Sequence, residues 1–148
     1  MPSSVWEQIS KEYQEYPEDF AELVTMDEIE EAEKKINLSF SHAYKKFIHL
    51  YGAGLFDGHF IHGLRYIDMM DKYSWSVIDK TNFYKQTQKW PDIDDWYVIS
   101  DDGRGNPIGI DPEGRVWLSD HDAGFEKVKL ADNFEEFLHK LLTDTLYE

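Results

Sequence analysis

The sequence lacks cysteine entirely, so neither disulfide bonds nor thiolate metal sites can form in its 148 residues. It also lacks any apolar run long enough to cross a membrane, and its first residues contain neither the basic nor the apolar segment of a signal peptide. These absences argue against secreted disulfide-stabilised folds and against membrane-spanning proteins. We therefore expect a soluble cytoplasmic protein that forms a single domain over residues 1–148.

Basic residues are scarce, because 15 Lys and Arg face 30 Asp and Glu and leave a formal net charge of -15. Such a charge repels phosphate backbones and anionic lipids, so we expect neither nucleic acid nor membranes as partners. A basic protein, in contrast, would be attracted. An acidic surface also keeps a protein soluble, and charge alone favours this simpler interpretation.

Common catalytic and nucleotide-binding motifs are absent as well. The sequence has no Gly-x-Ser-x-Gly nucleophile elbow, and Gly103 and Gly105 separate two expected strands instead of opening a helix as a phosphate loop does. Adjacent acids such as Asp101 and Asp102 are more typical of turns than of acid–base pairs. We predict no catalytic residue and no cofactor.

Two groups of residues could supply metal ligands, namely His59 with His62 and the run from Asp120 to Asp122. Positions three apart on a strand point to opposite faces, so the two histidines would meet only if the segment bends. A calcium loop counted from Asp101 fails, because glycines occupy its third and fifth positions and Pro112 its twelfth. We predict no metal site.

The centre of the chain has the pattern of a tight antiparallel meander. Three short apolar runs, residues 96–99, 108–110 and 116–118, are separated by clusters of Gly, Pro, Asn and Asp, which are typical of turns. The first turn is expected over residues 101–106 and the second over 111–114, where Pro and Gly suit the turn geometry.

Capping residues and apolar periodicity predict three helices ahead of this meander. Ser4, Thr25 and Ser41 can each accept a hydrogen bond at a helix N-terminus, and Thr25 begins a capping box with Glu28. The third helix should end at Gly52, since glycine favours the conformation that follows a helix.

The remaining segments are expected to alternate between strand and helix. Residues 55–64 form an apolar segment bounded by glycine that predicts one strand, and a helix capped by Ser74 should run to about Gln88. Residues 126–130 predict the last strand. A closing helix over residues 132–145 should lie on the sheet through an amphipathic stripe of apolar side chains: Phe134, Phe137, Leu138, Leu141 and Leu142.

Four motifs that span most of the chain follow one another in a recognisable order: Thr25–Ile29 with Glu33, Tyr44–Ile48 with Tyr51–Gly54, Ile99–Pro112 and Phe134–Leu138. Their order and spacing resemble the SMI1/KNR4 (SUKH) superfamily. The resemblance implies an α+β fold, with a curved antiparallel sheet of about four to six strands, N-terminal helices and a C-terminal helix packed against it. It also implies a protein-binding role, in bacteria mostly as an immunity protein against a polymorphic toxin and in fungi as a regulator of cell-wall synthesis.

The candidate binding site is the acidic, aromatic-rich stretch between Trp90 and Asp122. From Asp92 to Asp122 nine acidic residues face two basic ones, and tryptophans are interleaved with them. Aromatic anchors ringed by carboxylates suit an interface for a basic partner, whereas buried tryptophans and turn-forming acids would explain the same pattern without a partner. The predicted partner-binding residues are Trp90, Asp94, Asp95, Trp96, Asp101, Asp102, Arg104, Asn106, Asp120 and Asp122.

Three functions follow, in order of preference. The first is a bacterial immunity protein that covers a cognate basic toxin domain, such as a nuclease, with this acidic face. The second is an intracellular scaffold or regulator of the SMI1/KNR4 type whose partner is not a toxin. The last is a metal- or acid-dependent hydrolase. The sequence leaves the oligomeric state open.

Overall fold

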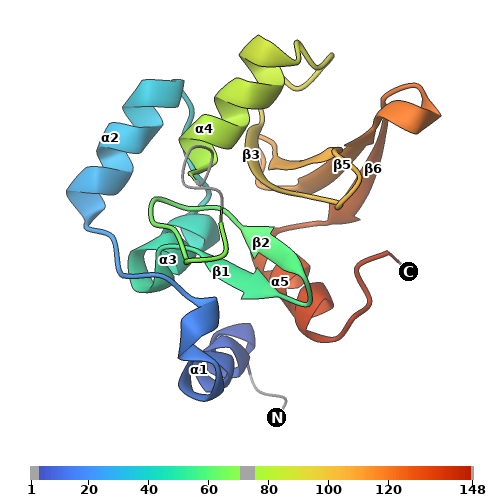
Figure 1. The fold of residues 1–148 in the computed structure, drawn as a ribbon. Helices are drawn as coiled ribbons and strands as arrows, with labels where there is room; N and C mark the ends of the chain where they lie inside the picture. Colours follow the sequence, from blue (N-terminus) through green and yellow to red (C-terminus); the bar gives the residue numbers. More distant parts are fainter. Residues whose placement is uncertain (1–3, 71–75, 148) are drawn as a thin grey trace.

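The computed structural model describes residues 4–70 and 76–147, which form helices, a two-stranded hairpin and a four-stranded antiparallel sheet (Figure 1). This arrangement confirms the predicted α+β fold. The N-terminal helix lies at one end of the molecule and the four-stranded sheet at the other. The α-helices are α1 (Val5–Glu15), α2 (Met26–Ile36), α3 (His42–Tyr51), α4 (Val77–Asn82) and α5 (Phe134–Leu142). The strands are β1 (Gly54–Phe56), β2 (His59–Ile61), β3 (Tyr97–Asp101), β4 (Pro107–Ile110), β5 (Val116–Asp120) and β6 (Glu126–Ala131).

Side-chain caps begin the helices where the sequence predicts them. The Oγ atoms of Ser4 and Ser41 accept hydrogen bonds from backbone N–H groups three residues later. Thr25 and Glu28 form the full capping box of α2, because each side chain satisfies a backbone N–H group that the helix leaves free. Gly52 follows α3 with φ 76°, as a helix-ending glycine should.

Two of the predicted segments differ in the structure. Residues 54–61 form a hairpin in place of a single strand, because Asp57 and Gly58 turn the chain with φ 51° and 80°. Helix α4 is capped by Ser76, whose Oγ accepts from the N–H of Asp79, while Ser74 lies outside the described residues. A short π-helix, η2 (Phe83–Thr87), then continues it close to the predicted end.

The main core lies between the helices and one face of the four-stranded sheet. Phe134 and Phe137 of α5 are buried in it, and the ring of Phe134 meets that of Tyr44 edge-on at 5.3 Å. Helix α5 ends at Leu142, three residues before the predicted end, and contacts α1, α3 and β6. Its stripe is buried as the periodicity predicts, apart from Leu142, which is half-buried.

The opposite face of the sheet is covered by the chain between α4 and β3. Trp96 and Val98 form a second, smaller core there with Tyr84 and Ile93. A Cβ atom at Gly109 would lie 2.8 Å from the Trp96 ring, so only glycine allows this close approach.

The free edge of β3 is closed by two elements from other parts of the chain. Thr81 of α4 accepts a hydrogen bond from the N–H of Val98 at 2.8 Å, and the N–H of His62 donates to the carbonyl of Ile99 at 2.7 Å. Covering an edge strand in this way removes a template for unwanted strand pairing. It also fixes β3, and with it the turn that follows.

Candidate functional site

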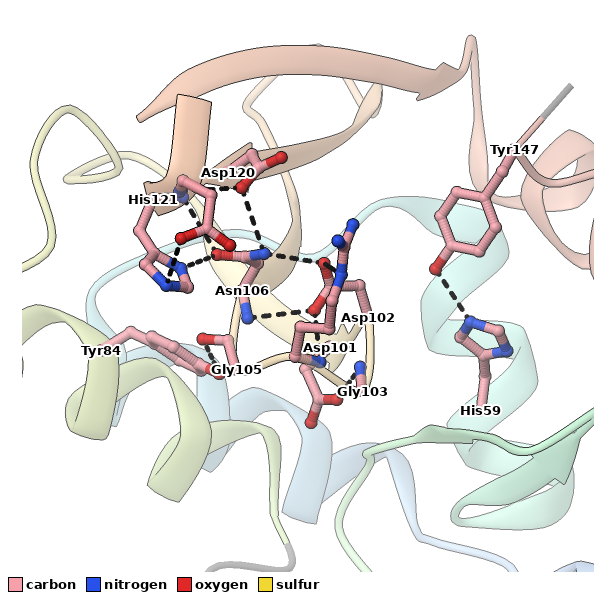
Figure 2. Close-up of polar contacts among 12 residues, drawn as sticks. His59, Tyr84, Asp101, Asp102, Gly103, Gly105, Asn106, Asp120, His121 and Tyr147 are labelled. Carbon is pink, nitrogen blue, oxygen red and sulfur yellow. Dashed lines mark hydrogen bonds and ion pairs between the residues drawn. The ribbon is translucent and has the colours of Figure 1, made fainter. Parts of the chain in front are cut away.

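Six of the predicted residues meet at one end of the four-stranded sheet. Because β3 to β6 are sequential antiparallel neighbours, the β3–β4 turn and the β5–β6 turn lie at the same end. Figure 2 shows side chains from both turns pointing toward one another. We call these residues the turn-end cluster: Asp101, Asp102, Arg104, Asn106, Asp120 and Asp122.

Asn106 joins the two turns and is completely buried. Its Nδ2 group donates to Asp102 Oδ2 at 2.8 Å and, more weakly, to Asp120 Oδ1 at 3.4 Å. Its Oδ1 atom accepts from the backbone N–H of His121 at 3.0 Å and contacts His121 Nδ1 at 2.5 Å (Figure 2). Since Oδ1 can only accept, Nδ1 of His121 carries a proton. One buried amide therefore sets the relative position of both turns.

The aspartates of the cluster also shape their own turns. Asp102 Oδ1 accepts from the N–H groups of Arg104 and Asn106, and Asp101 Oδ1 accepts from that of Gly103 at 2.8 Å. In the neighbouring turn, Asp120 Oδ1 accepts from the N–H of Asp122 at 3.0 Å. These are the local bonds that favour Asp in turns.

Asp102 is held in its ionised form. Burial alone would raise its pKa, but the hydrogen bonds from the Asn106 side chain and from the N–H groups of Arg104 and Asn106 outweigh burial, so the pKa lies below its usual range. Only 3% of the Asp102 side chain is exposed, whereas Asp122 and Arg104 expose 68% and 70% of theirs. Within the cluster, Asp102 therefore stabilises the β3–β4 turn, whereas Asp122 and Arg104 face solvent.

Of the two predicted tryptophans, the structure brings one to this surface. Trp90 is half-buried beside the β5–β6 turn, where its Nε1–H donates to Ser119 Oγ at 2.8 Å and its ring lies 5.9 Å from that of His121. Trp96 is only 3% exposed and belongs to the second core. For Trp96 the structure therefore shows the alternative that the sequence left open, a buried tryptophan, because the segment that leads into β3 folds over the sheet.

Asp94 and Asp95 are exposed but do not join the turn-end cluster. Both precede β3, whereas the cluster begins at its other end. Asp95 lines a separate groove of about 530 Å³ together with Glu30, Glu33 and Pro112. The predicted acidic field is thus divided between two parts of the surface.

The C-terminal Tyr147 is a neighbour that the sequence pattern does not reveal. Its hydroxyl group lies 2.9 Å from His59 Nε2, which joins the segment after α5 to the hairpin (Figure 2). Burial raises the pKa of Tyr147 to about 12, and the nearby carboxylates of Asp102 and Asp101 add to the effect. Tyr147, which is 57% exposed, is therefore within electrostatic reach of the turn-end cluster.

Among the described residues, one group has the chemistry and spacing of metal ligands. Ligand atoms of Asp120, His121 and Asp122 lie within 4.8 Å of one another. Asp120 and His121 already hold the turns together through Asn106, and His121 Nε2 lies 3.2 Å from Asp122 Oδ1. Exposed groups of this kind are common without an ion, so the absence of a metal stays a prediction.

These features define a small α+β protein whose candidate site is an open, charged surface built from two turns. The model of the SMI1-KNR4 cell-wall family (SUKH_5) matches residues 4–143, and the chain belongs to this family. The resemblance indicated by the sequence motifs is confirmed. Membership supports a protein-binding role of the immunity type. A search of curated proteins found no match, and no helix within residues 4–70 and 76–147 is long and apolar enough to span a membrane.

Proposed function

We propose that the chain is an immunity protein that binds a cognate basic toxin domain through the turn-end cluster and the adjoining Trp90. The observation that carries this proposal is the combination of a rigid, buried Asn106 network with exposed carboxylates at its surface. A preorganised acidic surface loses little entropy when a basic partner binds, and its field speeds the encounter. The family of the chain adds support for a protein partner.

The proposal assigns different roles to the predicted residues. Asp122 is exposed and would attract Lys and Arg side chains, and Asp94 and Asp95 would extend the field along the surface. Trp90 would serve as the aromatic anchor. Buried residues such as Asp102 would act indirectly, by holding the turns in place.

A second candidate is a regulator whose partner is not a toxin. It is favoured by the description of the matching family, which refers to the cell wall. The same surface would serve this role, so the two candidates differ in the partner and not in the site.

The test co-expresses the chain with the product of the gene immediately upstream of its own. If that product is a toxin with a basic C-terminal domain, the chain should restore growth and bind the domain directly. Association should slow several-fold between low salt and about 0.15 M, where the Debye length shortens to about 8 Å, while dissociation changes less. An upstream gene that encodes no toxin, or a toxin that the chain neither binds nor neutralises, would favour the regulator.

A matched pair of charge reversals tests the site. Asp122→Lys should lower the association rate several-fold, whereas Glu18→Lys, the same charge reversal at an exposed position in the short helix after α1, should not. Trp90→Ala should mainly raise the dissociation rate, because a desolvated aromatic anchor commonly contributes more than about 2 kcal/mol. Equal association rates for the two charge reversals would contradict the assignment of the site.

A further inference from the structure

A groove beside the turn-end cluster differs in charge from the rest of this acidic chain. It has a volume of about 360 Å³ and lies between the segment that precedes β3 and the two turns. The side chains that matter for its chemistry are three rings and two cations, and no acidic side chain among the described residues lines it. We call it the Trp90 groove, and these residues are Trp90, His121, Phe125, Lys89 and Arg104.

The aromatic wall of the groove is fixed by ring contacts and by the backbone. The Trp90 ring meets the ring of Phe125 at 5.3 Å and 88°, an edge-to-face arrangement. Phe125 has φ 64°, an unusual conformation for a bulky residue, and its N–H donates to the carbonyl of Asp120 at 2.8 Å. The wall is therefore set before any ligand enters.

The two cations retain free hydrogen-bonding capacity. Arg104 Nε lies 3.8 Å from Asp102 Oδ2, a long contact that leaves 70% of the Arg104 side chain exposed. Lys89 forms no ion pair within the described part of the chain. In a chain of net charge -15, the charged side chains that line this groove are the two cations Lys89 and Arg104.

We propose that the Trp90 groove binds a carboxylate that stands next to an aromatic side chain on the protein partner. Arg104 and Lys89 would bind the carboxylate, for which the planar guanidinium is well suited, and the ring would pack against Trp90 and Phe125. A volume of about 360 Å³ is within the range of small-ligand pockets, which begins near 300 Å³. This inference rests on the proposed function for the presence of a protein partner.

The groove would then determine specificity within an otherwise acidic surface. The exposed acids attract any basic protein, but a partner that lacks an acidic residue at this point would leave Lys89 without a counter-charge and Arg104 with only its long contact to Asp102. A partner with basic residues around one such acidic residue would pair with the exposed carboxylates and with the two cations of the groove. Discrimination by a local reversal of charge is a common way to reject wrong partners.

Three small probes test the groove without the toxin. N-acetyl-phenylalanine offers a terminal carboxylate, N-acetyl-glutamyl-phenylalanine amide a side-chain carboxylate, and N-acetyl-phenylalanine amide the same ring without charge. Binding is followed by the NMR signal of the Trp90 Nε1–H group, which is identified by its loss in Trp90→Phe. We expect the charged probes to shift this signal with dissociation constants on the order of 1 mM, and the neutral amide to bind about tenfold more weakly or not at all. The stronger of the two charged probes identifies the source of the carboxylate.

Matched variants complete the experiment. Arg104→Gln and Lys89→Gln should remove the preference for charged probes, whereas Lys11→Gln, at an exposed position of α1, should leave it unchanged. Equal binding of charged and neutral probes, or no shift with any probe, would overturn the inference. Salt-dependent binding of the toxin domain would persist in that case if the proposed function is correct, so the two failures are distinguishable.

Discussion

Replacing Asn106 with alanine removes only a small amide group, but it should destabilise the fold strongly. The residue is completely buried, and its Nδ2 group donates at 2.8 Å to a carboxylate that is itself almost inaccessible. Hydrogen bonds to charged groups contribute about 1.5–3 kcal/mol, and a neutral bond about 0.5–1.5 kcal/mol. The second value applies to the bond from the backbone N–H of His121 to Asn106 Oδ1, because His121 is partly exposed and water can replace the lost acceptor. The sum predicts a loss of about 2–4.5 kcal/mol.

Urea unfolding, followed by tryptophan fluorescence, measures this loss. With a slope of about 2 kcal/mol per molar urea, the midpoint should fall by about 1–2 M while the slope stays constant. Asn133→Ala is the matched control, because it deletes the same amide from the N-cap of α5, where the typical cost is about 1 kcal/mol.

A midpoint for Asn106→Ala at or above that of the Asn133→Ala control would refute the reasoning. It would mean that water replaces the amide without cost and that the two turns are positioned by other contacts. Asn106→Asp offers an independent check, because it places a second carboxylate against Asp102. Its destabilisation should shrink as the pH falls and one of the two acids takes up a proton.

Three further predictions concern the core, the response to acid and metal independence. Phe137→Ala should cost about 3–5 kcal/mol in urea unfolding, since the side chain is completely buried, and Phe83→Ala at an exposed position should cost far less. Asp102 and Asp111 have lowered pKa values because hydrogen bonds outweigh burial, so their stabilisation is complete above the unfolded pKa of about 3.9 and is lost as the pH falls below it. Asp111→Asn should therefore make acid unfolding below about pH 4 less steep. A chelator should leave the thermal midpoint unchanged, and a fall of several degrees would show that Asp120 and its neighbours hold an ion.

Much of the fold could be predicted because its signals are local. A cap such as Thr25 or Ser41 acts within three residues, and a stripe such as that of α5 is set by the helical period alone. The turns of the meander depend on Gly, Pro, Asn and Asp at fixed offsets. In each case the sequence contains both partners of the interaction within a few positions.

The position of Trp96 could not be predicted in this way. Alternation along β3 predicts one buried and one exposed face, but the chain from α4 returns over the second face and buries it too. For the same reason the sequence places Asp94 and Asp95 in one site with the turn-end cluster, although β3 separates them in the structure. The Trp90 groove needs three separate segments to come together, and no local pattern indicates it.

The two long turns of the sheet explain why charge counting alone is a poor guide to the site. Asp102 and Asp111 use the same geometry: Oδ1 accepts the N–H groups two and four residues later, and Oδ2 accepts a side-chain donor four residues later. At Asp111 that donor is the Arg115 guanidinium at 2.8 Å, which cancels the charge locally. At Asp102 it is the neutral amide of Asn106. The same turn chemistry thus neutralises Asp111 at close range but leaves Asp102 with only the longer contact to Arg104 at 3.8 Å, so a count of acids does not give the charge that each turn presents.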